Sequence, residues 1–250
     1  MNTDKPAHWN ESHKVSLYKV DYLNKLRIDS FFNYLQDAAS NHAETLGWGY
    51  NDLKRENLTW ILSRVKLIIN SYKGIGDFIK IDTWPKGVNG LLALREFRLI
   101  DEHEKVFALA TSAWLLVDSN TMRPVKTNEF NKRINHVYLD SEYAIKETPG
   151  KINVPENIEK IRERIIRYTD IDVNHHVNNA KYIEFVLDCF SIEEFRTKEI
   201  KSVQVNFLSE LKYGDKVTIS KGQFNSSNCS YIQGIKNDNI KVFQSFINWE

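Results

Sequence analysis

The segment RVKLIINS at Arg64–Ser71 is matched in the second half of the chain by KSVQVNFLS at Lys201–Ser209, aligned on their final serines. Without a gap, IGDFIKI at Ile75–Ile81 then falls on YGDKVTI at Tyr213–Ile219. Each copy reads as a strand, a turn marked by Gly-Asp, and a second strand. The chain therefore carries the same supersecondary unit twice.

A later match extends the repeat. Lys105–Phe107 leads to Trp114, and Lys241–Phe243 leads to Trp249, with spacings that differ by one residue. Repeats decide the architecture of a chain, because each copy must form the same unit. Several matches in the same order predict a duplication.

One helix is expected before each set of strands. In the first half, Asp29 or Ser30 can cap a helix that Gly47 ends. Its apolar side is formed by Phe31, Leu35, Ala38, Ala39, His42 and Leu46. In the second half, apolar residues recur at helical spacing from Val177 to Phe190.

Strands rich in Val, Ile, Phe and Trp follow each helix. In the first half they are predicted at Trp60–Asn70, Phe78–Trp84, Leu91–Ile100 and Val106–Val117. In the second half they are predicted at Ile200–Leu208, Lys216–Lys221, Tyr231–Lys236 and Ile240–Trp249. Short loops between them indicate antiparallel hairpins, so the predicted class is α+β, with a helix wrapped by a curved antiparallel sheet in each half.

The halves are expected at residues 1–125 and 161–250, with a connection at 126–160. Pro124, Pro149, Gly150 and Pro155 interrupt the pattern there. A short helix is expected in this connection near Phe130.

The composition is that of an ordinary globular protein. The 250 residues are 42% hydrophobic and 27% charged, and the formal net charge of +1 provides no overall field for nucleic acid or an anionic membrane. Cys189 and Cys229 form no metal-type pair and no disulfide framework. Residues 1–11 resemble neither a signal nor a transit peptide, so a cytoplasmic location is predicted.

Residues 167–179 gather carboxylates, amides and imidazoles between a strand and a helix. An EF-hand is excluded, because His175 stands where the loop needs Gly and Lys181 where it needs Glu. Zinc is disfavoured, because no Cys or His-Glu-x-x-His pattern accompanies the two adjacent histidines. A purely structural loop would explain Asn178 as a helix cap and Arg167 with Asp170 as an ion pair, but not the whole set.

The segment Asp170–Tyr182 (DIDVNHHVNNAKY) closely resembles the Asp-Leu-Asp-x-Asn-x-His-Val-Asn-Asn-x-Lys-Tyr motif of acyl-acyl carrier protein thioesterases. Landmarks of the same family are matched in the first half by Gln36–Ala39 with His42 and Gly47, Trp60–Arg64, Thr83–Pro85, Arg95–Phe97 and Trp114–Asp118. The resemblance implies two tandem hot-dog domains, which agrees with the repeat.

By this resemblance Asp172, Asn174 and His176 match catalytic positions. The family's catalytic glutamate lies in a Tyr-Arg-Arg-Glu-Cys stretch, and Phe207–Leu211 occupies that place here, so Glu210 is its match. Leu211 replaces the family's cysteine, which favours direct attack by water over a thiolate nucleophile. The resemblance implies no metal and no cofactor.

These residue types suit thioester hydrolysis. A carboxylate or an imidazole can take a proton from water, and an amide can donate to a developing oxyanion. The sequence leaves open which residue contacts the water. Tyr72 stands where the second half has Glu210, so one active site per chain is expected, in the second half. The first half is then expected to hold the acyl chain, although Ala38, Ala39 and Ala43 would equally suit ordinary helix–sheet packing.

The resemblance thus predicts an enzyme of fatty acid biosynthesis that hydrolyses fatty acyl-acyl carrier protein. The expected partner is acyl carrier protein, with no nucleic acid or membrane, and a homodimer is possible. The alternatives are an acyl-CoA thioesterase on the same fold and a non-catalytic acyl-binding hot-dog protein. A hot-dog dehydratase fits less well, because its motif differs.

Overall fold

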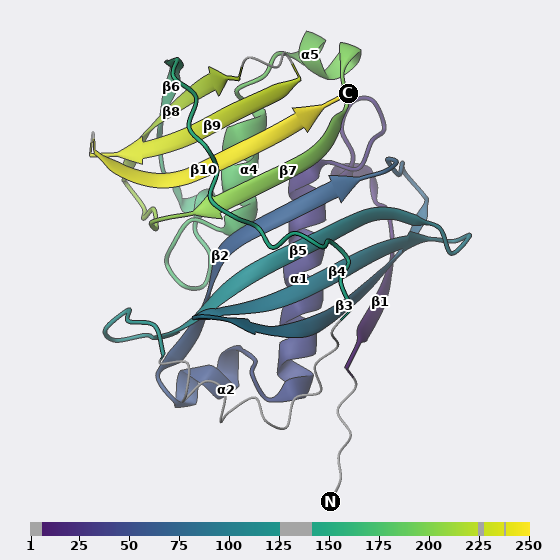
Figure 1. Cartoon of the computed structure of the whole chain (residues 1–250), viewed down its shortest axis with the longest axis vertical. Coiled ribbons are helices and arrows are strands. Elements are labelled where there is room, and N and C mark those ends of the chain that lie inside the picture. The colour runs from purple at the N-terminus through teal and green to yellow at the C-terminus, as the bar shows by residue number, and fades with distance from the viewer. Residues whose placement is uncertain (1–6, 126–141, 225–227, 238) are drawn as a thin grey trace, which may run out of the picture.

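Two copies of one arrangement, a helix followed by antiparallel strands, make up the chain (Figure 1). The computed structural model describes residues 7–125, 142–224, 228–237 and 239–250. The first half contains β1 (Trp9–Lys14), the 3-10 turn η1 (Leu17–Lys19), α1 (Ile28–Leu46), α2 (Tyr50–Arg55), β2 (Leu58–Ile69), β3 (Phe78–Asn89), β4 (Leu92–Asp101) and β5 (Val106–Asp118). The second half contains β6 (Ile158–Ile165), the 3-10 turn η2 (Tyr168–Asp170), α4 (Asn179–Leu187), α5 (Ile192–Thr197), β7 (Ile200–Phe207), β8 (Lys216–Gln223), β9 (Cys229–Lys236) and β10 (Ile240–Trp249).

The strands of the described residues form one antiparallel sheet of ten, in the order β1-β3-β4-β5-β2-β7-β10-β9-β8-β6. The halves join where β2 pairs with β7, with Val65 opposite Val205 and Leu67 opposite Val203. In the repeat Val65 corresponds to Val203, so this register is that of a pair related by an approximate two-fold axis. The eight strands predicted from the sequence are confirmed, and β1 and β6 at the sheet edges are additions to them.

Both long helices lie on the same side of the sheet (Figure 1). One continuous core contains buried side chains from each, such as Phe31 and Leu35 of α1 and Ile183 and Phe185 of α4. This arrangement confirms that each helix is wrapped by antiparallel strands. No helix among the described residues is long and apolar enough to cross a membrane.

The boundaries of α1 differ from the prediction at one end. Gly47 ends the helix with a φ of 78°, as expected for a residue without a Cβ in the left-handed region. The N-cap, however, is Arg27, and its side chain makes no capping hydrogen bond. The predicted cap at Asp29 or Ser30 is wrong, because Asp29 lies inside the helix and its Oδ1 accepts a hydrogen bond from Arg27 Nε at 2.9 Å.

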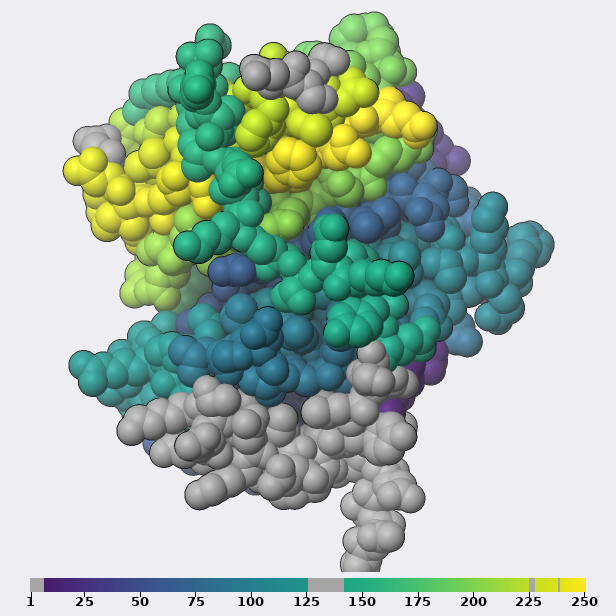
Figure 2. Space-filling model, in the orientation of Figure 1, coloured from purple at the N-terminus to yellow at the C-terminus, as the bar shows by residue number. Residues whose placement is uncertain are grey.

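The segment before β6 crosses the outer face of the sheet, on the side away from the helices (Figures 1 and 2). Arg64 Nη1 of β2 donates to Pro149 O at 3.0 Å, and Asn206 Nδ2 of β7 donates to Gly150 O at 3.0 Å. The segment thus contacts both halves at the seam between them. The helix predicted near Phe130 falls outside the described residues.

Candidate active site

The polar segment folds into a tight loop that ends at the first turn of α4. Ile171 and Val177 form an isolated antiparallel bridge, and Asp172 N donates to His176 O at 2.8 Å. His175 turns the chain with a φ of 62°. The backbone alone therefore holds residues 171–177 in one shape, with both ends fixed.

Two hydrogen bonds attach this loop to the chain after β7. Val177 N donates to Leu211 O at 2.9 Å, and Leu211 N donates to Tyr182 Oη at 3.1 Å. Leu211 is fully buried. Because Leu211 is held in this way, the preceding residue, Glu210, lies beside the loop.

His176 and Glu210 consequently meet across a separation of 34 positions in the sequence. His176 Nε2 lies 2.9 Å from Glu210 Oε2, and the two side chains are 29% and 34% exposed. The other carboxylate oxygen, Oε1, pairs with Lys212 Nζ at 3.0 Å. A solvent-accessible imidazole in contact with a carboxylate is suited to take a proton from water, because the carboxylate orients the ring.

Asp172 and Asn174 have different surroundings. Asp172 Oδ1 accepts a hydrogen bond from Asn174 N at 2.8 Å, so its carboxylate is used within the loop. Asn174 is exposed and lines a cavity that is otherwise made by the first half. The structure thus brings His176 and Glu210 into direct contact and places Asn174 at the edge of a cavity, with Asp172 supporting the loop between them.

The neighbouring polar residues have structural partners. Asn178 caps α4 by accepting from Ala180 N at 2.8 Å, as predicted. The predicted ion pair of Arg167 with Asp170 is wrong: the buried Asp170 pairs with Arg164 at 2.6 Å and takes only a backbone hydrogen bond from Arg167 N, at 2.8 Å. Arg164 extends from β6, an edge strand whose bounds were not predicted, so this partner was not predicted either.

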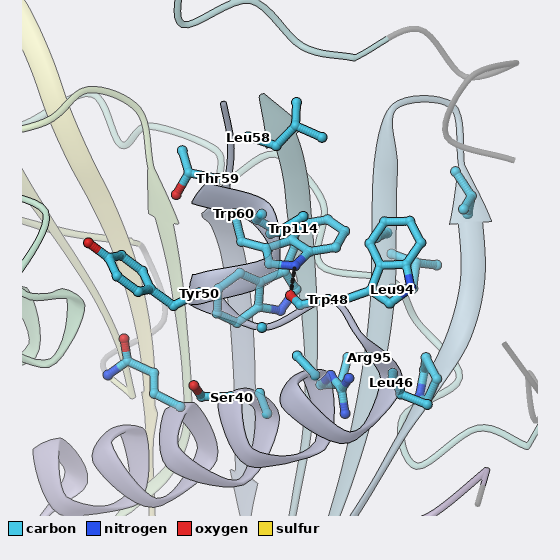
Figure 3. Close-up of a pocket in the computed structure, with 18 of the residues that line it drawn as sticks. Ser40, Leu46, Trp48, Tyr50, Leu58, Thr59, Trp60, Leu94, Arg95 and Trp114 are labelled. Atoms are coloured by element: carbon cyan, nitrogen blue, oxygen red, sulfur yellow. Dashed lines mark hydrogen bonds between the residues drawn. The ribbon is translucent and has the colours of Figure 1, made fainter. Parts of the chain in front are cut away.

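The cavity has a volume of about 230 Å³ and lies between the C-terminal part of α1, α2 and the strands of the first half. Ala39 and Ala43 of α1 line it, whereas Ala38 is packed in the core. Most of its wall is apolar and is formed by Leu46, Trp48, Leu53, Leu58, Trp60, Pro85, Val88, Ala93, Leu94 and Trp114. Figure 3 shows the indoles of Trp48, Trp60 and Trp114 gathered over α1, which carries Ser40 and Leu46.

One polar group is buried in the wall of this cavity. Arg95 Nη1 lies 3.1 Å from His42 Nδ1 and 3.2 Å from Thr83 Oγ1. Burial lowers the pKa of the Arg95 guanidinium to about 10. Thr83 and Arg95 were expected only as family landmarks, and His42 also as part of the apolar side of its helix. The pairing of β3 with β4 brings Thr83 and Arg95 together, and α1 adds His42 to the cluster.

A further contact links the two halves at the site. Asn179 Nδ2, at the start of α4, donates to Gln36 Oε1 of α1 at 3.0 Å, and Gln36 also lines the cavity. In the sequence the two residues belong to separate motifs. Their pairing depends on how α1 packs against α4, which local sequence does not report.

Neither cysteine belongs to the site. Cys189 is buried just after α4, its Sγ donates to Phe185 O at 3.3 Å, and burial raises the pKa of its thiol to about 11. Such a thiol is not a thiolate near neutral pH. Cys229 begins β9, with its Sγ 3.6 Å from Asn248 Oδ1.

Comparison with known families covers nearly the whole chain. The profile described as acyl-ACP thioesterase N-terminal domain matches residues 6–134, and that of the C-terminal domain matches residues 155–250. A chloroplastic palmitoyl-acyl carrier protein thioesterase of Arabidopsis thaliana is 26% identical over 80% of this chain and 51% of its own length. The chain spans about half the length of several of the curated relatives it matches.

Solved structures agree with the fold. An acyl-ACP thioesterase from Bacteroides thetaiotaomicron, 27% identical, covers 99% of this chain and 100% of its own with a TM-score of 0.89. A 12:0-ACP thioesterase from Umbellularia californica, 20% identical, covers 98% of both chains with a TM-score of 0.84, which bears on the fold alone. The predicted tandem hot-dog fold is confirmed.

Proposed function

The chain belongs to the acyl-ACP thioesterase family, and on this premise we propose that it hydrolyses the thioester of fatty acyl-acyl carrier protein, releasing a free fatty acid and the carrier thiol. The observation that carries the proposal is the contact of His176 with Glu210 at 2.9 Å, on the loop whose Asn174 borders an apolar cavity. A proton acceptor beside a cavity for an alkyl chain is what hydrolysis of a fatty acyl thioester requires.

In this mechanism the acyl chain lies in the cavity of the first half, and the second half supplies the chemistry. The thioester carbonyl lies near Asn174, whose amide donates to the oxygen as negative charge develops on it. Asp172 acts through its hydrogen bond to Asn174 N and thereby fixes the position of that amide. The catalytic set is therefore Asn174, His176 and Glu210, with Asp172 as a positioning residue.

His176, oriented by Glu210, removes a proton from a water molecule, and the water oxygen bonds to the carbonyl carbon. When the tetrahedral intermediate collapses, the carbon–sulfur bond breaks and its electron pair stays on sulfur. The imidazolium of His176 then returns the proton to the departing thiolate. Water attacks directly in this scheme, because the family's cysteine position holds the buried Leu211 and Cys189 has a raised thiol pKa.

Purified acyl-acyl carrier protein and acyl-CoA thioesters of graded chain length test the proposal. We expect a higher kcat/KM with the carrier protein, falling as salt is raised, because carrier proteins are acidic and salt screens the charges that guide encounter. Equal or faster turnover of acyl-CoA would assign the chain to acyl-CoA hydrolysis instead. Binding without hydrolysis of either substrate, at every chain length, would leave an acyl-binding protein.

A further inference from the structure

A second cavity, of about 490 Å³, lies between the start of α1 and the end of α4. Its walls come from the loop before α1, from Tyr72 after β2, and from the segment that runs from the end of α4 through α5 to β7. Tyr22 Oη of the loop donates to Ile192 O of α5 at 2.9 Å and so ties the two walls together.

The loop in this cavity is a backbone copy of the loop that carries His176. Val20 and Leu26 form an isolated bridge like that of Ile171 and Val177, and Asp21 N donates to Lys25 O at 2.8 Å. The turn residue Asn24 has a φ of 58°. Counting from these features, the first-half loop is related to the second by an offset of 151 residues.

This offset shows that the two cavities are equivalent. Leu23 corresponds to Asn174, and each lines the cavity beside its own loop. Along the helices, Leu187 and Phe190 correspond to Gln36 and Ala39, and these four residues also line their respective cavities. The second cavity is thus the counterpart, under the approximate two-fold axis, of the cavity at the proposed active site.

At equivalent positions the second cavity has lost polar groups of the first and has gained apolar side chains. The hydrogen bond of Asn179 to Gln36 is replaced by two apolar residues, Ile28 and Leu187, which both line the second cavity. At the position of Glu210 stands Tyr72, whose hydroxyl donates to Ile200 O at 2.8 Å. The groups that would activate water are absent from these equivalent positions, while the apolar surface that would contact an alkyl chain is extended by Phe195 and Ile192.

The charged residues of this cavity favour an anion. Four cations and three carboxylates line it: Lys25, Arg27, Arg162 and Lys198 against Asp21, Asp188 and Glu199. All three carboxylates have partners within the protein. Asp21 Oδ1 accepts from two amides of its own loop, Asp188 pairs with Arg162 at 2.8 Å, and Glu199 pairs with Lys25 at 2.5 Å.

Two of the cations have capacity for a further anion. Lys198 is exposed at the rim, and Arg162 Nε is buried without a hydrogen-bond partner among the described residues. Buried donors of this kind favour an acceptor brought by a ligand.

We propose that this cavity is a second, non-catalytic site that binds a long-chain carboxylate. The alkyl chain lies along Leu23, Ile28 and Leu187. The carboxylate lies near Lys198 and Arg162, the two cations with capacity for a further anion. The proposal concerns binding alone, so it is independent of the hydrolysis proposed above.

Calorimetric titration of the full chain with dodecanoate, below the concentration at which it aggregates, tests the proposal. We expect two equivalents to bind. Leu23→Glu should weaken one of them by at least about tenfold, because it places a like charge beside the carboxylate, whereas the matched variant Leu23→Met should keep both. Ala43→Trp, which fills the cavity of the first half, should instead remove the other equivalent.

The exposed Lys198→Glu variant provides a second measurement that does not depend on the loop. It should weaken the same equivalent as Leu23→Glu and leave the thermal unfolding temperature unchanged. Either of two results would overturn the proposal. In the first, the unaltered chain binds a single equivalent of dodecanoate, and Ala43→Trp removes it. In the second, Leu23→Glu and Lys198→Glu each still bind two equivalents with unchanged affinity. If dodecanoate binds but Ala43→Trp has no effect, the second site stands and the acyl cavity assigned to the first half is wrong.

Discussion

The loop before α1 and the loop before α4 share a backbone and differ in their side chains. Both contain a bridge, a turn residue of positive φ and an aspartate at the same position, Asp21 or Asp172, whose Oδ1 accepts hydrogen bonds from backbone amides of its own loop. His176 in one loop is matched by Lys25 in the other. The shared features determine the shape of the loop. The side chains that differ are therefore the ones available for catalysis.

The largest effect is expected at the loop position that holds His176 in the second half and Lys25 in the first. His176→Ala should lower kcat by about 10²-fold or more, the scale of a lost general base. Lys25→Ala, its counterpart, should change kcat by less than about twofold, because its part-buried ion pair with Glu199 lies at the other cavity. Steady-state kinetics with one acyl-acyl carrier protein checks both variants, with circular dichroism to show that they are folded.

The next comparison is between Glu210, which follows β7, and Tyr72, which follows β2. Glu210→Ala should also lower kcat by about 10²-fold, because His176 loses its orienting carboxylate. Tyr72→Phe should leave kcat unchanged and cost about 1 kcal/mol of unfolding free energy, since only the hydrogen bond to Ile200 O is lost. Near-normal turnover by Glu210→Ala would mean that His176 does not need this carboxylate to act.

The two aspartates separate loop shape from catalysis. Asp21→Ala and Asp172→Ala should each lower the unfolding free energy by about 1–2 kcal/mol, through loss of hydrogen bonds from backbone amides to a charged acceptor. Only Asp172→Ala should also slow hydrolysis. Asp172→Asn keeps an acceptor oxygen and should recover most of the rate; if it is as slow as Asp172→Ala, the charge itself participates in the reaction.

The smallest effect on rate is expected at Cys189, which corresponds to Ala38 in the first helix by the same offset. The double variant Cys189→Ala, Cys229→Ser should retain most activity, because neither thiol contacts the site. An acyl group trapped on either cysteine and detected by mass spectrometry would refute direct attack by water.

Cys189 also has an expected effect on stability at alkaline pH. Its pKa is raised to about 11 in the folded chain, from about 8.5 in an unfolded one. The folded state keeps the thiol proton up to a higher pH than the unfolded state does. The thiol therefore contributes stability below the unfolded pKa and loses this contribution as pH rises through the folded pKa. The free energy of unfolding of the unaltered chain, measured with denaturant, should therefore fall by up to about 3 kcal/mol more than that of Cys189→Ala between pH 8.5 and 11.

The central strands were predictable because they alternate or run apolar and are bounded by Gly-Asp turns. The edge strand β1 and the bounds of the edge strand β6 were not, because each of these strands pairs on one side only and carries charged residues, as in IEKIRERI at Ile158–Ile165. Such a strand lacks the regular apolar positions from which a strand is predicted.

The same contrast holds within the site. Asp172, Asn174 and His176 lie within five residues of one another, so one motif indicated all three. Glu210 lies outside that motif and was indicated only by matching Phe207–Leu211 to a second stretch of the family, since its contact with His176 depends on the hydrogen bond from Val177 N to Leu211 O. The cavity arises from packing within the first half, and the link between Gln36 and Asn179 arises from packing between the halves. No local pattern encodes either of them.

The pairing of β2 with β7 has a consequence for how the site responds to dilution. The cavity belongs to one half and Asn174 to the other, and two separate half-chains with this division would form the site only above the dissociation constant of their association. Here both halves belong to one polypeptide, so their association is intramolecular and has an effective concentration that dilution does not change. The activity of each molecule should therefore stay constant as the protein is diluted to nanomolar levels and below.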